Sequence, residues 1–141
     1  MQPFAPDATV GAVIDADRDV STFNNLVRRS GVIKRIDTDG PYTILAPTNA
    51  AFDLLPPGAL GALVSDGQKL TAVMSYHVVK GEYRGEEIRN HDHLPTLLGD
   101  PLLVVAAEDG VVVGGAGLEE IDITATNGLV HKIDAVMFPG D

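Results

Sequence analysis

The densest group of metal-ligating side chains in this 141-residue sequence is His91-Asp92-His93. Imidazole and carboxylate groups bind zinc, and two histidines one residue apart on an extended loop can share one ion. A complete site needs further ligands, and none stands at a regular spacing from these residues. We therefore predict a solvated loop at this point, with no metal and no cofactor.

The sequence also lacks the patterns that mark common catalytic sites. It has no cysteine, no Gly-x-Ser-x-Gly turn, no Gly-rich phosphate loop and no His-Glu-x-x-His helix. Asp53 and Asp134 could pair as an acid and a base, but any acidic chain offers such pairs. We therefore expect a binding protein rather than an enzyme.

The charge of the chain narrows the choice of partner. It carries 20 acidic and 10 basic residues, for a formal net charge of -10. From His91 onward, nine acids stand against a single base, Lys132. Such a surface repels nucleic-acid phosphates and anionic lipids. No apolar run reaches the roughly 18 residues of a membrane helix, so we expect no insertion into the membrane interior. We also expect a monomer that does not bind nucleic acid.

The first half of the chain shows helical spacing of its apolar residues. Thr9 is a cap for a short helix, and a second helix begins near Ser21 and stops at Gly31. Thr48 or Asn49 caps another short helix after a buried strand that ends at Pro47. A later helix has one apolar face, formed by Leu70, Val73, Met74 and His77.

The second half consists of short β-prone runs separated by turn residues. Residues 108–110 and 126–128 are hairpin turns, and Gly114-Gly115-Ala116-Gly117 is also read as a turn. Helices first and strands later predict an α+β fold, with the N-terminal helices packed on a β-rich sandwich or wedge. The expected strands are Thr96–Leu98, Leu102–Ala107, Val111–Val113, Leu118–Thr124 and Leu129–Met137.

The chain is predicted to hold one domain, residues 9–139, behind a tail-like leader at residues 1–8. The leader lacks the basic start and apolar run of a signal peptide. It fits a cytoplasmic protein, and it fits equally a secreted one whose signal has been replaced by a start codon. The absence of cysteine does not choose between the two compartments.

Three segments of the sequence resemble blocks of the fasciclin family, and they occur along the chain in the family's order. One is similar to the family's closing block, Asp122-Ile123-x-Ala125-Thr126-Asn127-Gly128-Leu129-Val130-His131-x-Ile133-Asp134-x-Val136. Another is similar to its Tyr-His element, which follows a helix, Tyr76-His77-Val78-Val79. The segment that comes first in the chain resembles the family's block in which a strand is followed by Ala-Pro-Thr-Asn-x-Ala-Phe. In this sequence the segment reads Tyr42-Thr43-Ile44-Leu45-Ala46-Pro47-Thr48-Asn49-Ala50-Ala51-Phe52-Asp53-Leu54-Leu55-Pro56.

The resemblance implies an adhesion module that binds cell-surface or matrix proteins, and a secreted, periplasmic or cell-surface location. In animal matrix members of the family, the Tyr-His region and the Asp-Ile pair are proposed to face integrins. In this sequence those residues are Tyr76, His77, Asp122 and Ile123. A small-ligand or glycan-binding protein is the alternative, and a cavity of roughly 300 Å³ or more would favour it.

The same residues also have structural interpretations. His77 shares its helix face with apolar residues, and strand alternation puts His131 on an apolar side, so we expect both to be buried and hydrogen-bonded. Capping alone explains Thr48 and Asn49. Asp122 either accepts from a partner's base or satisfies local amides, and Tyr76 is either a contact or a core residue. Asn127 belongs to the turn before the last strand.

Overall fold

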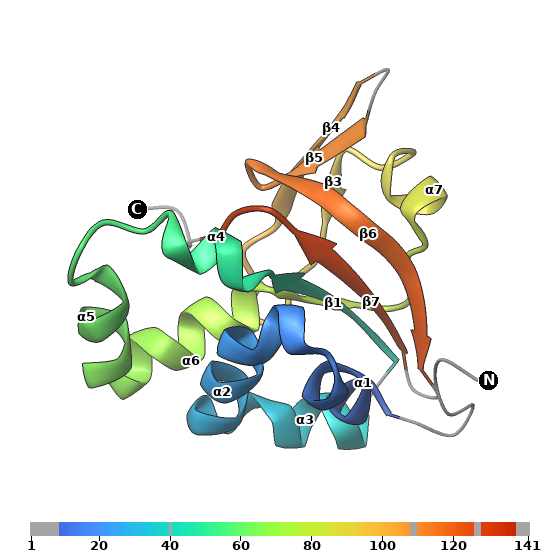
Figure 1. The fold of residues 1–141 in the computed structure, drawn as a ribbon. Helices are drawn as coiled ribbons and strands as arrows, with labels where there is room; N and C mark the ends of the chain where they lie inside the picture. Colours follow the sequence, from blue (N-terminus) through green and yellow to red (C-terminus); the bar gives the residue numbers. More distant parts are fainter. Residues whose placement is uncertain (1–8, 40, 108–109, 126–127, 138–141) are drawn as a thin grey trace.

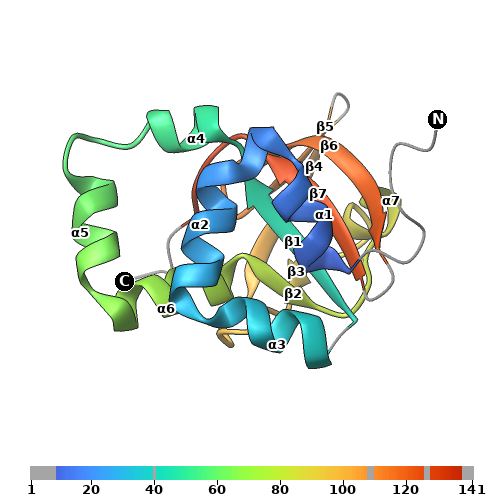
Figure 2. The same ribbon diagram turned by 60° about the horizontal axis from the view of Figure 1, so that its bottom comes forward.

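The computed structural model describes residues 9–39, 41–107, 110–125 and 128–137 of the chain. Within these residues, most of the helices lie against one face of a seven-stranded mixed sheet, as Figures 1 and 2 show from two directions. The predicted α+β class is therefore confirmed, with most of the helices preceding most of the strands.

The sheet is built around one parallel pair of strands. Its order is β2-β1-β7-β6-β5-β4-β3, and β1 and β7 run parallel while every other pair of neighbours is antiparallel. The strands are β1 (Tyr42–Pro47), β2 (Val78–Lys80), β3 (His93–Leu94), β4 (Leu102–Ala107), β5 (Gly110–Val113), β6 (Ala116–Ala125) and β7 (Gly128–Ile133).

Most helices begin or end at residues that satisfy the exposed backbone groups. Thr9 accepts from the Ala12 amide, and Gly31 ends the second helix with a φ of 84°, so both of these predicted boundaries are confirmed. The helices are α1 (Val10–Ala16), the 3-10 helix η1 (Arg18–Val20), α2 (Ser21–Ser30), α3 (Val32–Asp39), α4 (Asn49–Asp53), α5 (Ala59–Ser65), α6 (Gly67–Tyr76) and α7 (Gly85–Ile88).

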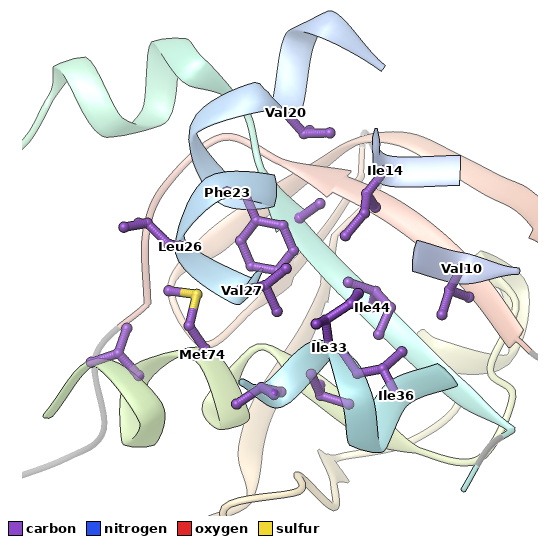
Figure 3. Close-up of a cluster of buried hydrophobic side chains, with 14 of the residues drawn as sticks. Val10, Ile14, Val20, Phe23, Leu26, Val27, Ile33, Ile36, Ile44 and Met74 are labelled. Atoms are coloured by element: carbon purple, nitrogen blue, oxygen red, sulfur yellow. The ribbon is translucent and has the colours of Figure 1, made fainter. Parts of the chain in front are cut away.

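Two apolar clusters lie on opposite faces of the central strands. On the helical side, Ile44 of β1 and Val130 of β7 join the buried residues of α1, α2, α3 and α6, and Figure 3 shows Phe23 among them. On the other side, Leu45 and Ile133 join residues of β4, β5 and α7. All residues of β1 and β7 are consequently buried, as expected for a strand pair covered on both faces.

Some elements differ from the sequence prediction. The sequence patterns predict neither the α-helices α3, α5 and α7 nor the 3-10 helix η1. For α3 the reason is that Gly31 ends α2 and the chain turns at once into a new helix. Residues 96–98 form only an isolated bridge, since the Thr96 hydroxyl donates to the Asp100 carbonyl and folds the segment into a loop. The last strand ends at Ile133 rather than Met137.

The predicted hairpins join the expected strands. Ala107 pairs with Gly110 between β4 and β5, and Ala125 pairs with Gly128 between β6 and β7. The intervening turn residues, 108–109 and 126–127, lie outside the described part of the chain.

Gly128 allows the parallel pair to form. It opens β7 opposite Tyr42 of β1, and a Cβ atom at this position would overlap the Tyr42 carbonyl oxygen. That oxygen belongs to a buried strand backbone, which cannot move aside as the end of a flexible side chain can. The two central strands therefore require a residue without a side chain at position 128.

We predict that Gly128→Ala lowers the free energy of unfolding by more than about 3 kcal/mol, because the β1 and β7 backbones must separate. Gly61→Ala is the matched control: Gly61 lies in α5 with open space around it, so alanine should stabilise the helix by about 0.5 to 1 kcal/mol. Urea unfolding of both variants measures the difference. A Gly128→Ala variant as stable as the wild type would contradict this account of the pairing.

Candidate functional site

His77 lies in the interior of the domain, at the C-terminal end of α6. Its side chain is fully buried, as predicted, and its ring centroid lies 6.0 Å from that of Phe23 in α2. Nδ1 lies 2.7 Å from the Val73 carbonyl oxygen, one turn earlier, and Nε2 lies 3.0 Å from the Met137 amide nitrogen. His77 therefore holds the segment that follows β7.

These two partners determine the protonation state of His77. The carbonyl oxygen can only accept, so Nδ1 carries the proton, and the Met137 N–H must donate to an unprotonated Nε2. Burial lowers the pKa of His77 to about 4, and the hydrogen bond to Val73 opposes this shift only in part. The imidazole is therefore neutral at pH 7.

Tyr76, the neighbour of His77, belongs to the other apolar cluster. It is 9% exposed and packs among residues such as Leu45 and Ile133. Burial, and secondarily the negative charge of Asp100, raise the pKa of Tyr76 above its usual range. The Tyr-His element thus contributes one side chain to each face of the central sheet.

His131 and Thr43 hold the loop that leads from β2 to α7. His131, in β7, is fully buried, and its Nε2 lies 2.7 Å from the Tyr83 carbonyl oxygen. The Thr43 hydroxyl, in β1, donates to the Gly81 carbonyl oxygen at 2.7 Å and accepts from the Tyr83 amide at 2.9 Å. The expected burial of His131 is confirmed, and its ring joins a central strand to a distant loop.

Thr48 and Asn49 have different roles. The Thr48 hydroxyl caps α4 by accepting from the Ala51 amide at 3.3 Å. The Asn49 side chain instead accepts from the Thr22 amide at 3.0 Å and donates to the Arg18 carbonyl oxygen at 2.8 Å. It thereby caps α2, whose own N-cap residue, Val20, provides no side-chain hydrogen bond.

Lys132 contributes a contact that the sequence did not reveal. Alternation puts it on the face of β7 opposite His131, but that face is covered by α1 and η1, so the Lys132 side chain is only 7% exposed. Its Nζ lies 2.7 Å from Asp17 Oδ2 and 3.2 Å from Asp19 Oδ2. The only signal in the sequence is that Lys132 is the sole base after residue 91.

The remaining candidates are Asp122, Ile123 and Asn127, together with the 91–93 segment at the start of β3. Ile123 is partly buried and packs against the helical-side cluster. The side chain of Asp122 and all of Asn127 lie outside the described residues. In the 91–93 segment, His91 Nδ1 lies 2.8 Å from the Glu87 carbonyl oxygen and its ring stacks edge-on with Tyr83, whereas His93 pairs with Leu103 between β3 and β4.

No group of three or more His, Asp or Glu side chains that could hold a metal ion occurs among the described residues. In the same part of the chain, every helix is too short or too polar to cross a lipid bilayer.

The buried state of His77 makes stability depend on pH. The unfolded chain protonates His77 near pH 6.5 and the folded chain only near pH 4. This contribution to stability is therefore complete above about pH 6.5, falls as the pH drops, and is lost by about pH 4, for a total of about 3 kcal/mol. Denaturant unfolding between these pH values measures it.

The His77→Ala variant should be about 1 to 3 kcal/mol less stable at pH 7, since it leaves a cavity and an unpaired Met137 amide. It should also lose the part of the pH dependence that His77 causes. The exposed His93 provides the control, because His93→Ala removes no buried side chain and should keep the wild-type stability at pH 7. An unchanged pH profile in His77→Ala would refute the assignment.

Removing either of the two capping side chains should lower the stability of the domain. Thr48→Ala removes the α4 cap and should cost about 1 kcal/mol. Asn49→Ala removes the hydrogen bonds to η1 and α2 and should cost at least as much. Asn25→Ala, at an exposed position of α2, should leave the chemical denaturation midpoint unchanged or raise it. Equal midpoints for Asn49→Ala and Asn25→Ala would disprove the role of Asn49 as a cap of α2.

Comparison with known proteins shows which family and which solved structure this chain resembles. The Fasciclin domain family matches residues 18–139. The solved structure of a FAS1 domain pair from the insect cell adhesion molecule Fasciclin I superposes with a TM-score of 0.68 at 24% identity, covering 85% of this chain and 45% of that one. At this level of identity the superposition supports the fold alone.

Curated relatives are also similar in sequence, including the following two. Transforming growth factor-beta-induced protein ig-h3 of Oryctolagus cuniculus is 34% identical over 95% of this chain, which spans 20% of ig-h3. The cell surface glycolipoprotein MPB83 of Mycobacterium bovis is 37% identical over 76% of this chain, which spans 49% of MPB83. The family match covers most of the sequence and the fold agrees with it, so the chain belongs to the fasciclin domain family.

Proposed function

We propose that this domain is a non-catalytic adhesion module that binds protein partners at a cell surface or in an extracellular matrix. The observation that carries the proposal is the match to the fasciclin domain over most of the chain. It is supported by relatives whose names describe a cell surface glycolipoprotein and an insect cell adhesion molecule. The partners of these proteins are not proposed for this domain, because this chain spans half or less of the length of each protein.

The placement of the polar candidates supports binding by the outer surface. The rings of His77 and His131 are buried and hydrogen-bonded to backbone groups, and the Thr48 and Asn49 side chains cap helices. These interactions use the polar atoms to hold the fold together. A partner would therefore be recognised by exposed side chains around this framework.

A contact role for Tyr76, His77, Asp122 and Ile123 stays a prediction. Tyr76 and His77 are buried, so in this conformation they would influence a partner through the residues that they hold in place, such as Met137. Ile123 is partly exposed and could contribute apolar area, while Asp122 would offer a carboxylate to a basic group.

The charge of the chain favours a basic partner. A net charge of -10 produces a negative field that speeds encounter with a positive surface and is screened by salt. We propose that adhesion is electrostatically steered, and that the module acts as a monomer outside the cytoplasm.

The test is cell attachment to surfaces coated with the purified domain. We expect attachment above that of an inert acidic protein of the same net charge. It should weaken as ionic strength rises from about 0.05 to about 0.3 M at constant osmolarity, since the Debye length shortens over this range. A folded Asp122→Asn variant should attach fewer cells.

Attachment equal to that of the inert protein would refute the adhesion function. Wild-type attachment by a folded Asp122→Asn variant would remove only that residue from the site. Loss of attachment on addition of free glycans, with no effect of salt, would instead favour the alternative of a glycan-binding protein.

A further inference from the structure

The β4–β5 hairpin carries apolar side chains on its outer face. Leu103 and Val105 lie two residues apart in β4, and Val105 pairs directly with Val112 of β5. These side chains are 56%, 52% and 37% exposed, respectively. We call Leu103, Val105 and Val112 the hairpin face.

The hairpin face breaks the usual pattern of a half-buried sheet. The inward residues of the same strands, including Leu102, Val104 and Val113, are buried in a cluster that Ile88 of α7 also joins. Antiparallel strands with one wet face normally alternate apolar and polar residues. The outward residues here are also apolar and adjacent, which marks an interaction surface more often than single exposed side chains do.

The position of the hairpin leaves this face accessible. Figure 1 shows β4 and β5 at the end of the sheet away from α1, α2 and α3. Among the described residues, the two-residue strand β3 lies beyond β4; it pairs with Leu102 and Leu103, and the Val104 amide donates to the Asp92 carbonyl oxygen. The part of β4 that contains Val105 is therefore at the margin of the sheet.

The charges of the sequence on either side of the hairpin distinguish between possible occupants. From residue 91 to residue 131 the sequence contains no lysine or arginine, and Asp92, Asp100 and Glu119 are exposed. The next base, Lys132, is buried against Asp17 and Asp19. A second copy of this chain or an anionic lipid surface would bring like charges together, whereas a basic surface would be attracted.

We propose that the hairpin face is a docking site for a partner protein that presents apolar side chains flanked by lysine or arginine. The apolar side chains would cover Leu103, Val105 and Val112, and the bases would meet the surrounding carboxylates. This inference rests on the proposed adhesion function, since it assigns the surface and the partner chemistry through which that function would operate.

The direct test uses a synthetic peptide of about ten residues, at the upper end of usual strand lengths, that alternates valine and lysine. Lys-Ser and Glu-Val peptides of equal length remove the apolar or the basic component. We expect the Lys-Val peptide alone to shift the NMR signals of β4 and β5. Leu103→Thr/Val105→Thr/Val112→Thr should weaken its binding by about tenfold or more, because the apolar contact is lost.

The matched control is Leu54→Ser, since Leu54 follows α4 and, at 75%, is the most exposed large apolar residue in the described part of the chain. The Leu54→Ser variant should bind the Lys-Val peptide as the wild type does. Both this control and the triple variant should keep the wild-type unfolding temperature. Equal binding of the Lys-Ser peptide, unchanged binding by the triple variant, or shifts centred elsewhere would overturn the proposal. Self-association or binding to anionic vesicles that the triple variant abolishes would also overturn it.

The cell-attachment assay separates this inference from the adhesion function. If the wild type attaches cells and the triple variant attaches them equally well, the hairpin face is wrong and the adhesion function stands. If the Lys-Val peptide binds the hairpin face but the wild type attaches no cells, the docking site stands and the adhesion function is wrong.

Discussion

The parallel pairing of β1 and β7 is the constraint on which the rest of this structure depends. It joins residues 42–47, in the first third of the chain, to residues 128–133 near its end, so most of the chain lies between the two paired strands. The pair has an apolar cluster on each face, and each cluster contains side chains from both strands. A separation of the two strands would therefore expose both clusters at once.

The buried polar residues extend this constraint to distant segments. His77 holds the backbone at Met137, His131 holds the loop at Tyr83, and Lys132 holds the η1 region through two aspartates. Each contact joins residues that are far apart in the sequence. Because unpaired polar groups are costly in an apolar interior, these contacts favour one arrangement of the layers over others.

Local signals in the sequence were sufficient for much of the fold. Caps, turn residues and apolar spacing gave the α+β class, the Thr9 cap, the Gly31 stop and the main strands, because each depends on a few adjacent residues. The burial of His77 also followed from its helix face. The contacts that needed the tertiary structure were different: Asn49 caps a helix more than 20 residues earlier, and Lys132 meets its partners across the sheet.

The parts of the candidate site that the sequence does not predict depend on which faces are covered in the folded domain. Periodicity assigned residues to faces, but it did not indicate which faces would be covered. The face of Lys132 was expected to be the polar one and is covered by helices, whereas the outer face of the β4–β5 hairpin is apolar and exposed. Coverage depends on how the layers are arranged, which no single segment encodes.

Native-state hydrogen exchange tests the central claim most directly. If the β1–β7 pair holds the domain together, the backbone amides of residues 43–46 and 129–133 should exchange only through global unfolding, with a free energy equal to that from denaturant. The amides of the β4–β5 hairpin, at the margin of the sheet, should exchange through openings of lower free energy. Amides of β1 and β7 that exchange more readily than those of the hairpin would contradict this account.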